Sequence, residues 1–227
     1  MEPLTIVIVA VILLFPILLV KEARKQKKTS MSVFESYAIS HGWTYMQKDD
    51  GTIQKLAKDF QSIGRFNSPS LGNIIPENVV IGSVPEGKIY LFQHYVRIYE
   101  GNALQLDVCI LELEKPIIDR LIIRFKKGKS RLTNDLYTMP ELDIDPKWTN
   151  DVAIYKNDPK FKDVLDDSTL TTLVQKANNL PWRTDLQIKN NLLAVYIAER
   201  NSSVESENDL SLLIDFARYT VDNIQET

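Results

Sequence analysis

Apolar residues occur in two patterns along the chain, a continuous run near the start and periodic spacings after it. Residues 4–20 form a run of seventeen residues without a charged side chain. As a helix that rises about 1.5 Å per residue, this run is roughly 26 Å long, close to a bilayer core of about 30 Å. We therefore predict one transmembrane helix, with residues 1–20 as a membrane anchor.

The residues that flank this run predict its orientation. Glu2 precedes it, and five basic residues follow it closely: Lys21, Arg24, Lys25, Lys27 and Lys28. Cytoplasmic flanks of membrane spans are enriched in Lys and Arg, and no A-x-A-like cleavage site follows Val20. We predict an uncleaved single-pass anchor in the bacterial inner (plasma) membrane, with the N-terminus outside and the remainder in the cytoplasm. Residues 21–31 are a basic juxtamembrane linker, and contact of its five basic residues with anionic lipid is a second interpretation of the same charges.

Helical spacing resumes after the linker. Ser32 and Glu35 have the spacing of a capping box, and apolar residues follow on one face up to Gly42, a typical helix-ending residue. A short strand is expected at residues 43–45, and a second helix has Ile53 and Phe60 on its apolar face.

Alternating residues predict three antiparallel strands at 78–84, 88–99 and 103–113. Three-residue loops at 85–87 and 100–102 would connect them. With these loops the apolar residues at even positions of the second and third strands share one side of the sheet. The other side carries Gln93, Tyr95, Arg97 and Tyr99, with Tyr95 opposite Asp107.

Tyr95, Arg97 and Tyr99 form a candidate partner-binding patch, because exposed Tyr and Arg side chains are frequent anchors at protein interfaces. The alternative is an ordinary half-solvated sheet face stabilised by cross-strand pairs. The sequence leaves both interpretations open.

The second half of the chain continues the mixture of strands and helices. Strands are expected at 121–126, 152–155, 185–189 and 192–198, with Asn190 and Asn191 as a type I′ turn. Three helices are expected in this half of the chain. The first starts at Asp158-Pro159, the second follows a cap at Ser168, and the third covers 210–224 after the capping pair Ser206 and Asp209. The predicted fold class is α+β, a mainly antiparallel sheet with flanking helices, in one cytoplasmic domain at 32–227. The polar segment 128–147 is the place for an internal boundary.

Composition limits the chemistry. The whole chain has a net charge of −3, and residues 1–29 contribute +3 of it from five basic and two acidic residues. Residues 30–227 therefore carry −6. This negative charge argues against a nucleic-acid-binding surface. With two histidines, His41 and His94, and one cysteine, Cys109, we predict no metal site and no cofactor. Asp143, Asp145 and Asp151 lack the glycine and glutamate positions of a calcium loop. We find no catalytic motif.

The order of these motifs resembles that of an uncharacterised family of bacterial single-pass membrane-anchored proteins. The resemblance rests on the anchor and basic linker, Gly42-Trp43-x-Tyr45, Asp158-Pro159-x-Phe161, and LLAVYIAER after Asn190-Asn191. It implies a cytoplasmic α+β domain with no assigned activity, and therefore no functional residue is transferred.

The sequence leaves three hypotheses for function. The first is a membrane-anchored cytoplasmic domain that binds another protein or the membrane surface. The second is an enzyme with a carboxylate-based or Ser/Lys-based site near residues 128–147, and the third is a sensor of a small ligand.

Overall fold

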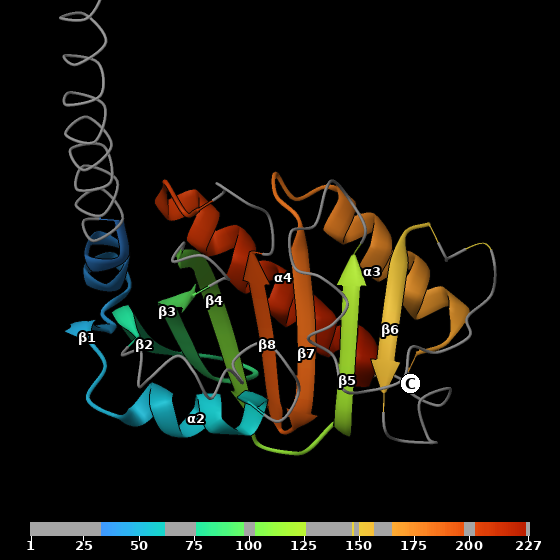
Figure 1. Ribbon diagram of the computed structural model, residues 1–227, viewed down its shortest axis with the longest axis horizontal. Coiled ribbons are helices and arrows are strands. Elements are labelled where there is room, and N and C mark those ends of the chain that lie inside the picture. The colour runs from blue at the N-terminus through green and yellow to red at the C-terminus, as the bar shows by residue number, and fades with distance from the viewer. Residues whose placement is uncertain are drawn as a thin grey trace, which may run out of the picture.

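The computed structural model describes residues 33–61, 76–97, 103–125, 147, 150–156, 165–197 and 203–225. Eight strands form one sheet, and helices cover both of its faces (Figure 1). The strands are β1 (Thr44–Lys48), β2 (Glu77–Val84), β3 (Gly87–Arg97), β4 (Ala103–Leu113), β5 (Ile118–Phe125), β6 (Val152–Lys156), β7 (Thr184–Asn190) and β8 (Leu192–Ile197). The helices are α2 (Thr52–Gln61), α3 (Asp167–Asn178) and α4 (Glu207–Gln225), and residues 33–41 are also helical.

The strand order is β1-β2-β3-β4-β8-β7-β5-β6, and all seven neighbouring pairs are antiparallel. The late hairpin β7–β8 lies between β4 and β5, so β4 and β5 are not neighbours although they are consecutive in sequence. The predicted fold class, an α+β chain with an antiparallel sheet and flanking helices, is confirmed.

Two predicted turns differ in the structure. Val84 pairs with Gly87, so the first hairpin turns on two residues instead of three. A Cβ at Gly87 would lie 2.1 Å from the carbonyl oxygen of Glu112, and only glycine allows this approach. Asn190 and Asn191 form the predicted two-residue turn, but only Asn190 has a positive φ, 55°, whereas a type I′ turn needs one at both positions.

The β3–β4 register is offset by two residues from the prediction. Asp107 pairs with Gln93, and Tyr95 pairs with Gln105. The offset arises because Arg97 pairs with Ala103, so that the connection between the strands is longer than three residues. An offset of two preserves the side on which each residue lies.

Helix 33–41, α3 and α4 cover one face of the sheet, here called the α4 face. Figure 1 shows α3 and α4 on the far side of the strands, and α4 contacts β4 and β8. Asp166, rather than the predicted Ser168, caps α3 by accepting a hydrogen bond from the backbone of Thr169. The predicted capping pair is confirmed at α4, where Ser206 and Asp209 each accept a hydrogen bond from the other's backbone.

The opposite face, here called the α2 face, carries a second apolar cluster. Ile53 of α2 belongs to it, together with Phe92, Val108, Ile122 and Tyr196 from the sheet. The central strands are therefore buried on both faces. Within the described ranges, no helix is long and apolar enough to span a membrane; the predicted anchor and linker lie outside these ranges.

Candidate functional site

A line of hydrogen-bonded side chains crosses the first four strands on the α4 face. The Tyr45 hydroxyl donates to Oδ1 of Asn78 at 3.1 Å, and Nδ2 of Asn78 donates to Oε1 of Gln93 at 2.5 Å. Nε2 of Gln93 donates in turn to Oδ1 of Asp107 at 2.7 Å. Every donor faces the same way, from the sheet edge at β1 towards the carboxylate on β4. We call these four side chains the polar line.

Asp107 at the end of the polar line holds the chain that enters α4. Its other oxygen, Oδ2, accepts a hydrogen bond from the backbone N–H of Val204 at 2.8 Å, and Gln105 adds a longer bond to Oδ1 at 3.4 Å. The residue is 1% exposed. Burial raises the pKa of its carboxyl to about 6, against the hydrogen bonds from Gln93, Val204 and Gln105, while the nearby charge of Asp209 raises it further.

A bulge in β2 brings Asn78 into the polar line. Gln93 pairs with Glu77, but Leu91 pairs with Val80, so β2 contains one extra residue between these pairs. Asn78 lies in the bulge with φ 52°, a left-handed conformation that Asn adopts more readily than most residues. The bulge thus supplies a second amide beside Gln93.

A buried charged cluster lies on the α2 face, in the other half of the sheet. Nε of Arg124 on β5 lies 3.6 Å from Oδ2 of Asp185 on β7, and Nε of Arg183 lies 3.7 Å from its Oδ1. Asp185 is completely buried, as are its neighbours Gln187 and Tyr196, which share a 2.8 Å hydrogen bond. The two guanidinium groups offset part of the cost of burying the carboxylate.

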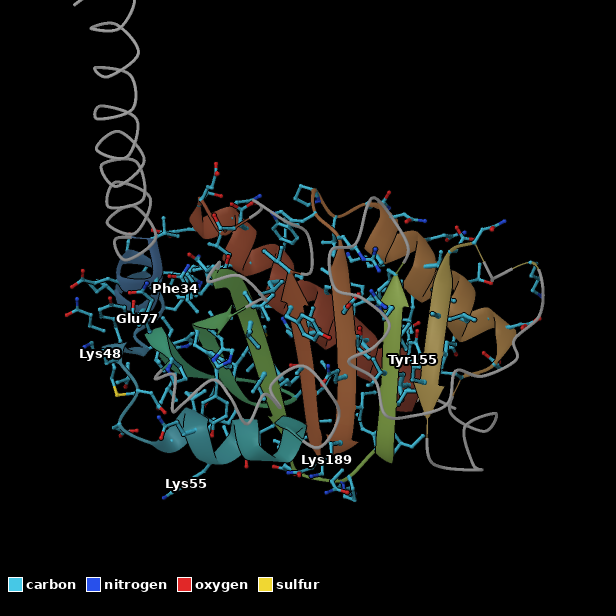
Figure 2. All side chains as sticks on the ribbon, viewed as in Figure 1. Phe34, Lys48, Lys55, Glu77, Tyr155 and Lys189 are labelled. Carbon is cyan, nitrogen blue, oxygen red and sulfur yellow. The ribbon has the colours of Figure 1, made fainter. Side chains whose placement is uncertain are left out.

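The polar line and the charged cluster are separated along the sheet. Figure 2 shows Lys48 and Glu77 near one edge, on the strands that carry Tyr45 and Asn78, and Tyr155 near the other edge on β6. On the α2 face, Tyr155 lies beside Ile122, which pairs with Gln187. The charged cluster is therefore surrounded by the apolar side chains of that face.

Cys109 is a buried titratable group, and His94 is a partly buried one. Burial lowers the pKa of His94 to about 4 and raises the pKa of the Cys109 thiol. At neutral pH these shifts favour a neutral imidazole and a protonated thiol.

The first described helix is tied to the start of α4. The Ser36 hydroxyl donates to Glu207, and the Ser211 hydroxyl donates to the Tyr37 hydroxyl at 3.5 Å. Phe34, labelled in Figure 2, is completely buried beneath the same helix. His41 stacks on Tyr37 with ring centroids 4.0 Å apart. The helix that follows the predicted linker is thus part of the domain core.

The predicted patch is only partly described. Tyr95 and Arg97 lie on β3, but their side chains and all of Tyr99 are outside the described set, so the patch remains a prediction. The described residues of the same sheet face, Gln93 and Asp107, are buried and hydrogen-bonded to each other, in contrast to the half-solvated alternative.

The other predicted sites also extend beyond the described residues. The linker residues Lys21, Arg24, Lys25, Lys27 and Lys28 lie outside them, as do Asp143 and Asp145, while Asp151 precedes β6. Among the side chains that the structure describes, no group of three or more His, Cys, Asp or Glu is placed to hold a metal ion.

Sequence patterns missed the polar line and the charged cluster. Gln93 and Asp107 fit the pattern of a half-solvated sheet face, one of the two interpretations of these strands, and no pattern marks Asp185 as buried. The available signal was Arg124 within the otherwise apolar LIIRF of β5, because a charge inside such a run requires a buried partner.

No protein-family model and no curated protein sequence matches the chain. Among solved structures, it is similar to the crystal structure of the mycobacterial trehalose monomycolate transport factor A, TtfA. The TM-score is 0.60, the identity is 16%, and the alignment covers 86% of this chain and 94% of that chain. At this identity the similarity shows a common fold.

Proposed function

We propose that the chain is a membrane-anchored, non-catalytic component of a lipid-transport system, with residues 32–227 as its cytoplasmic interaction domain. The observation that supports this most directly is the fold shared with a transport factor over 94% of that factor's crystallised chain. The similarity involves almost the whole of both chains, so the domain is comparable as a unit rather than as one appended module.

The predicted anchor gives this domain its place of action. Residues 4–20 would hold it at the bilayer, and the basic linker would orient it towards the cytoplasm and the anionic lipids of that leaflet. Twelve residues separate this predicted span from residue 33, and the described helix 33–41 packs into the core through Phe34. A short linker and a packed first helix together keep the domain close to the membrane.

The two polar clusters support a binding role over a catalytic one. Each carboxylate oxygen of Asp107 accepts a hydrogen bond from within the fold, and Asp185 lies between two arginines. Both carboxylates are also fully buried. Groups held in this way stabilise the sheet and are not presented to a substrate.

Depletion of the protein in the organism that encodes it tests this proposal. After a pulse of radioactive acetate, we expect total lipid synthesis to stay unchanged while newly made envelope lipid accumulates at the inner membrane. A fall in synthesis of one lipid would instead indicate an enzyme, and an unchanged distribution would contradict the proposal.

Two complementing variants separate the anchor from the domain. The chain without residues 1–31 is expected to fail in complementation, because it lacks the predicted membrane anchor. The same domain behind an unrelated single-pass anchor of equal orientation is expected to restore transport. If the soluble domain alone restores transport, membrane attachment is not part of the function.

A further inference from the structure

The polar line has an unusual composition for a hydrogen-bond network inside a sheet. Its two inner members, Asn78 and Gln93, are primary amides, and each uses its oxygen as acceptor and its nitrogen as donor. A half-turn of a primary amide exchanges donor and acceptor with almost no change in shape. Its outer members are a hydroxyl and a carboxyl, groups that also exist in both roles.

We propose that the polar line is a proton-operated switch: protonation of Asp107 reverses all of its hydrogen bonds and converts the Tyr45 hydroxyl from a donor to an acceptor. This device is independent of the proposed function, since it follows from four side chains and their distances.

The reversed state satisfies the same groups. The new O–H of Asp107 donates to Oε1 of Gln93, whose Nε2 then donates to Oδ1 of Asn78. Nδ2 of Asn78 donates to the Tyr45 hydroxyl, and the carbonyl oxygen of Asp107 still accepts from the backbone N–H of Val204. The proton that Asp107 gains comes from solvent, and no backbone bond is lost. The Tyr45 hydrogen becomes available to water or to a molecule bound at the edge strand β1.

The electrostatic surroundings of Asp107 favour a proton on it within an accessible pH range. Burial dominates and raises its pKa to about 6. Titratable groups on the elements around it include Cys109 and Glu112 on β4, His94 on β3, Glu35, Tyr37 and His41 on helix 33–41, and Glu205, Glu207 and Asp209 around the start of α4. Asp209 increases the proton affinity of Asp107, while the cation Arg218 of α4 pairs with Glu86. With these surroundings, Asp107 is expected to gain its proton at weakly acidic pH.

The switch connects two parts of the domain. Asp107 holds the chain at Val204, just before α4, and Tyr45 lies half-buried on the edge strand that directly follows helix 33–41. Helix 33–41 also bonds to the start of α4 through Ser36. Protonation at one end therefore changes the hydrogen bonding that the sheet edge offers at the other.

Raman spectroscopy of the full-length protein in detergent micelles tests the proposal. The intensity ratio of the tyrosine Fermi doublet reports whether a phenol donates or accepts a hydrogen bond, and subtraction of a Tyr45→Phe spectrum isolates Tyr45. We expect a donor signal at about pH 7.5 and an acceptor signal at about pH 4.5, with a midpoint near 6. A Tyr45 signal that stays constant in the folded wild-type protein overturns the proposal.

Two variants locate the origin of the change. Asp107→Asn has the hydrogen-bonding groups of the protonated acid, so Tyr45 is expected to give the acceptor signal at both pH values. Gln93→Leu interrupts the line, so the infrared band of the protonated Asp107 carboxyl should still titrate while the Tyr45 signal does not. A Tyr45 transition that persists in Gln93→Leu, or in Asp107→Asn, overturns the proposal. If Asp107→Asn does not fold, the wild-type and Gln93→Leu spectra decide it.

Discussion

The indole of Trp43 lies directly against the backbone of Gly82: a Cβ added to Gly82 would be 2.0 Å from Cδ2 of the ring. Trp43 comes just before the edge strand β1, and Gly82 lies on the neighbouring strand β2. The ring occupies the space that any side chain at position 82 would need. Glycine is required there by its neighbour and not by its own backbone conformation.

Gly82→Ala is therefore expected to lower the free energy of unfolding by about 1–3 kcal/mol, the usual range for overpacking. The measurement is urea unfolding of the detergent-solubilised protein, followed by tryptophan fluorescence. In a Trp43→Ala background, followed by circular dichroism, the same substitution should be nearly neutral because the space is empty. Equal losses in both backgrounds would contradict the steric explanation.

The charged cluster predicts a larger loss at Asp185. Asp185→Asn removes the carboxylate between Arg124 and Arg183, and the loss of one partner of a buried ion pair typically costs about 3–5 kcal/mol. Urea unfolding measures this loss. Asp215→Asn, at an exposed position of α4, is the matched control and should change stability by less than about 0.5 kcal/mol.

Asp107 contributes a stability term that decreases with rising pH. The pKa of its carboxyl rises from 3.8 to about 6 on folding, so the folded state binds the proton more tightly than the unfolded state. Its contribution is complete below pH 3.8 and is lost as the pH rises through about 6, a change of about 3 kcal/mol. The difference in unfolding free energy between wild type and Asp107→Asn should follow this curve. A difference independent of pH would contradict it.

The contribution of His94 to the unfolding free energy changes with pH in the opposite direction, over nearly the same pH range. Burial lowers its pKa from 6.5 to about 4, so the unfolded state binds the proton more tightly. Its contribution is present above pH 6.5 and is lost as the pH falls through about 4. Relative to wild type, His94→Gln should therefore lose its stability deficit on acidification, whereas Asp107→Asn should develop one. Thermal unfolding at several pH values distinguishes the two slopes.

Truncation of two apolar residues of helix 33–41 should lower the free energy of unfolding by very different amounts. Phe34 is completely buried, whereas Ile39 is 74% exposed. Phe34→Ala is expected to cost about 3–5 kcal/mol through lost burial and the cavity left behind. Ile39→Ala should cost less than about 0.5 kcal/mol in the same unfolding assay. A large loss at Ile39 would show that another surface covers it in the protein as it exists in detergent.

If residues 4–20 span the membrane, we expect the five basic residues that follow them to set the orientation of the chain. Replacing Lys21, Arg24, Lys25, Lys27 and Lys28 by Gln and adding lysines before Leu4 should invert the chain in the membrane. Protease digestion of inside-out membrane vesicles measures this: the wild-type domain is digested, and the inverted one is protected. Digestion of both would show that these charges do not set the topology.

Local signals in the sequence predicted most elements of the fold but not their neighbours. Gly42, Ser206 with Asp209, and the alternating residues of β3 and β4 specify short-range structure, and each element is present. The insertion of β7–β8 beside β4 depends on pairs such as Cys109 with Val195, which are more than eighty residues apart. No local pattern contains that information.

The same limit explains why the candidate site was missed. Gln93 and Asp107 have the alternation of a half-exposed strand, and only the covering helices make them buried. The hydrogen bond from Asn78 to Gln93 depends on a bulge, which the sequence of β2 does not show. Sequence patterns therefore identified the residues of the sheet face, while the layers above it determine their chemistry.

The position of the β7–β8 hairpin has a consequence for how the protein is made. During synthesis β4 leaves the ribosome well before β8 has been translated. Until then the edge of β4 that pairs with β8 is unpaired, and β5 lacks its partner β7. A sheet joined through such distant segments is expected to close slowly, and only after residues 184–197 have been translated. If residues 4–20 enter the bilayer as predicted, insertion precedes folding. The nascent domain would then spend that interval tethered at the membrane surface with the edge of β4 unpaired.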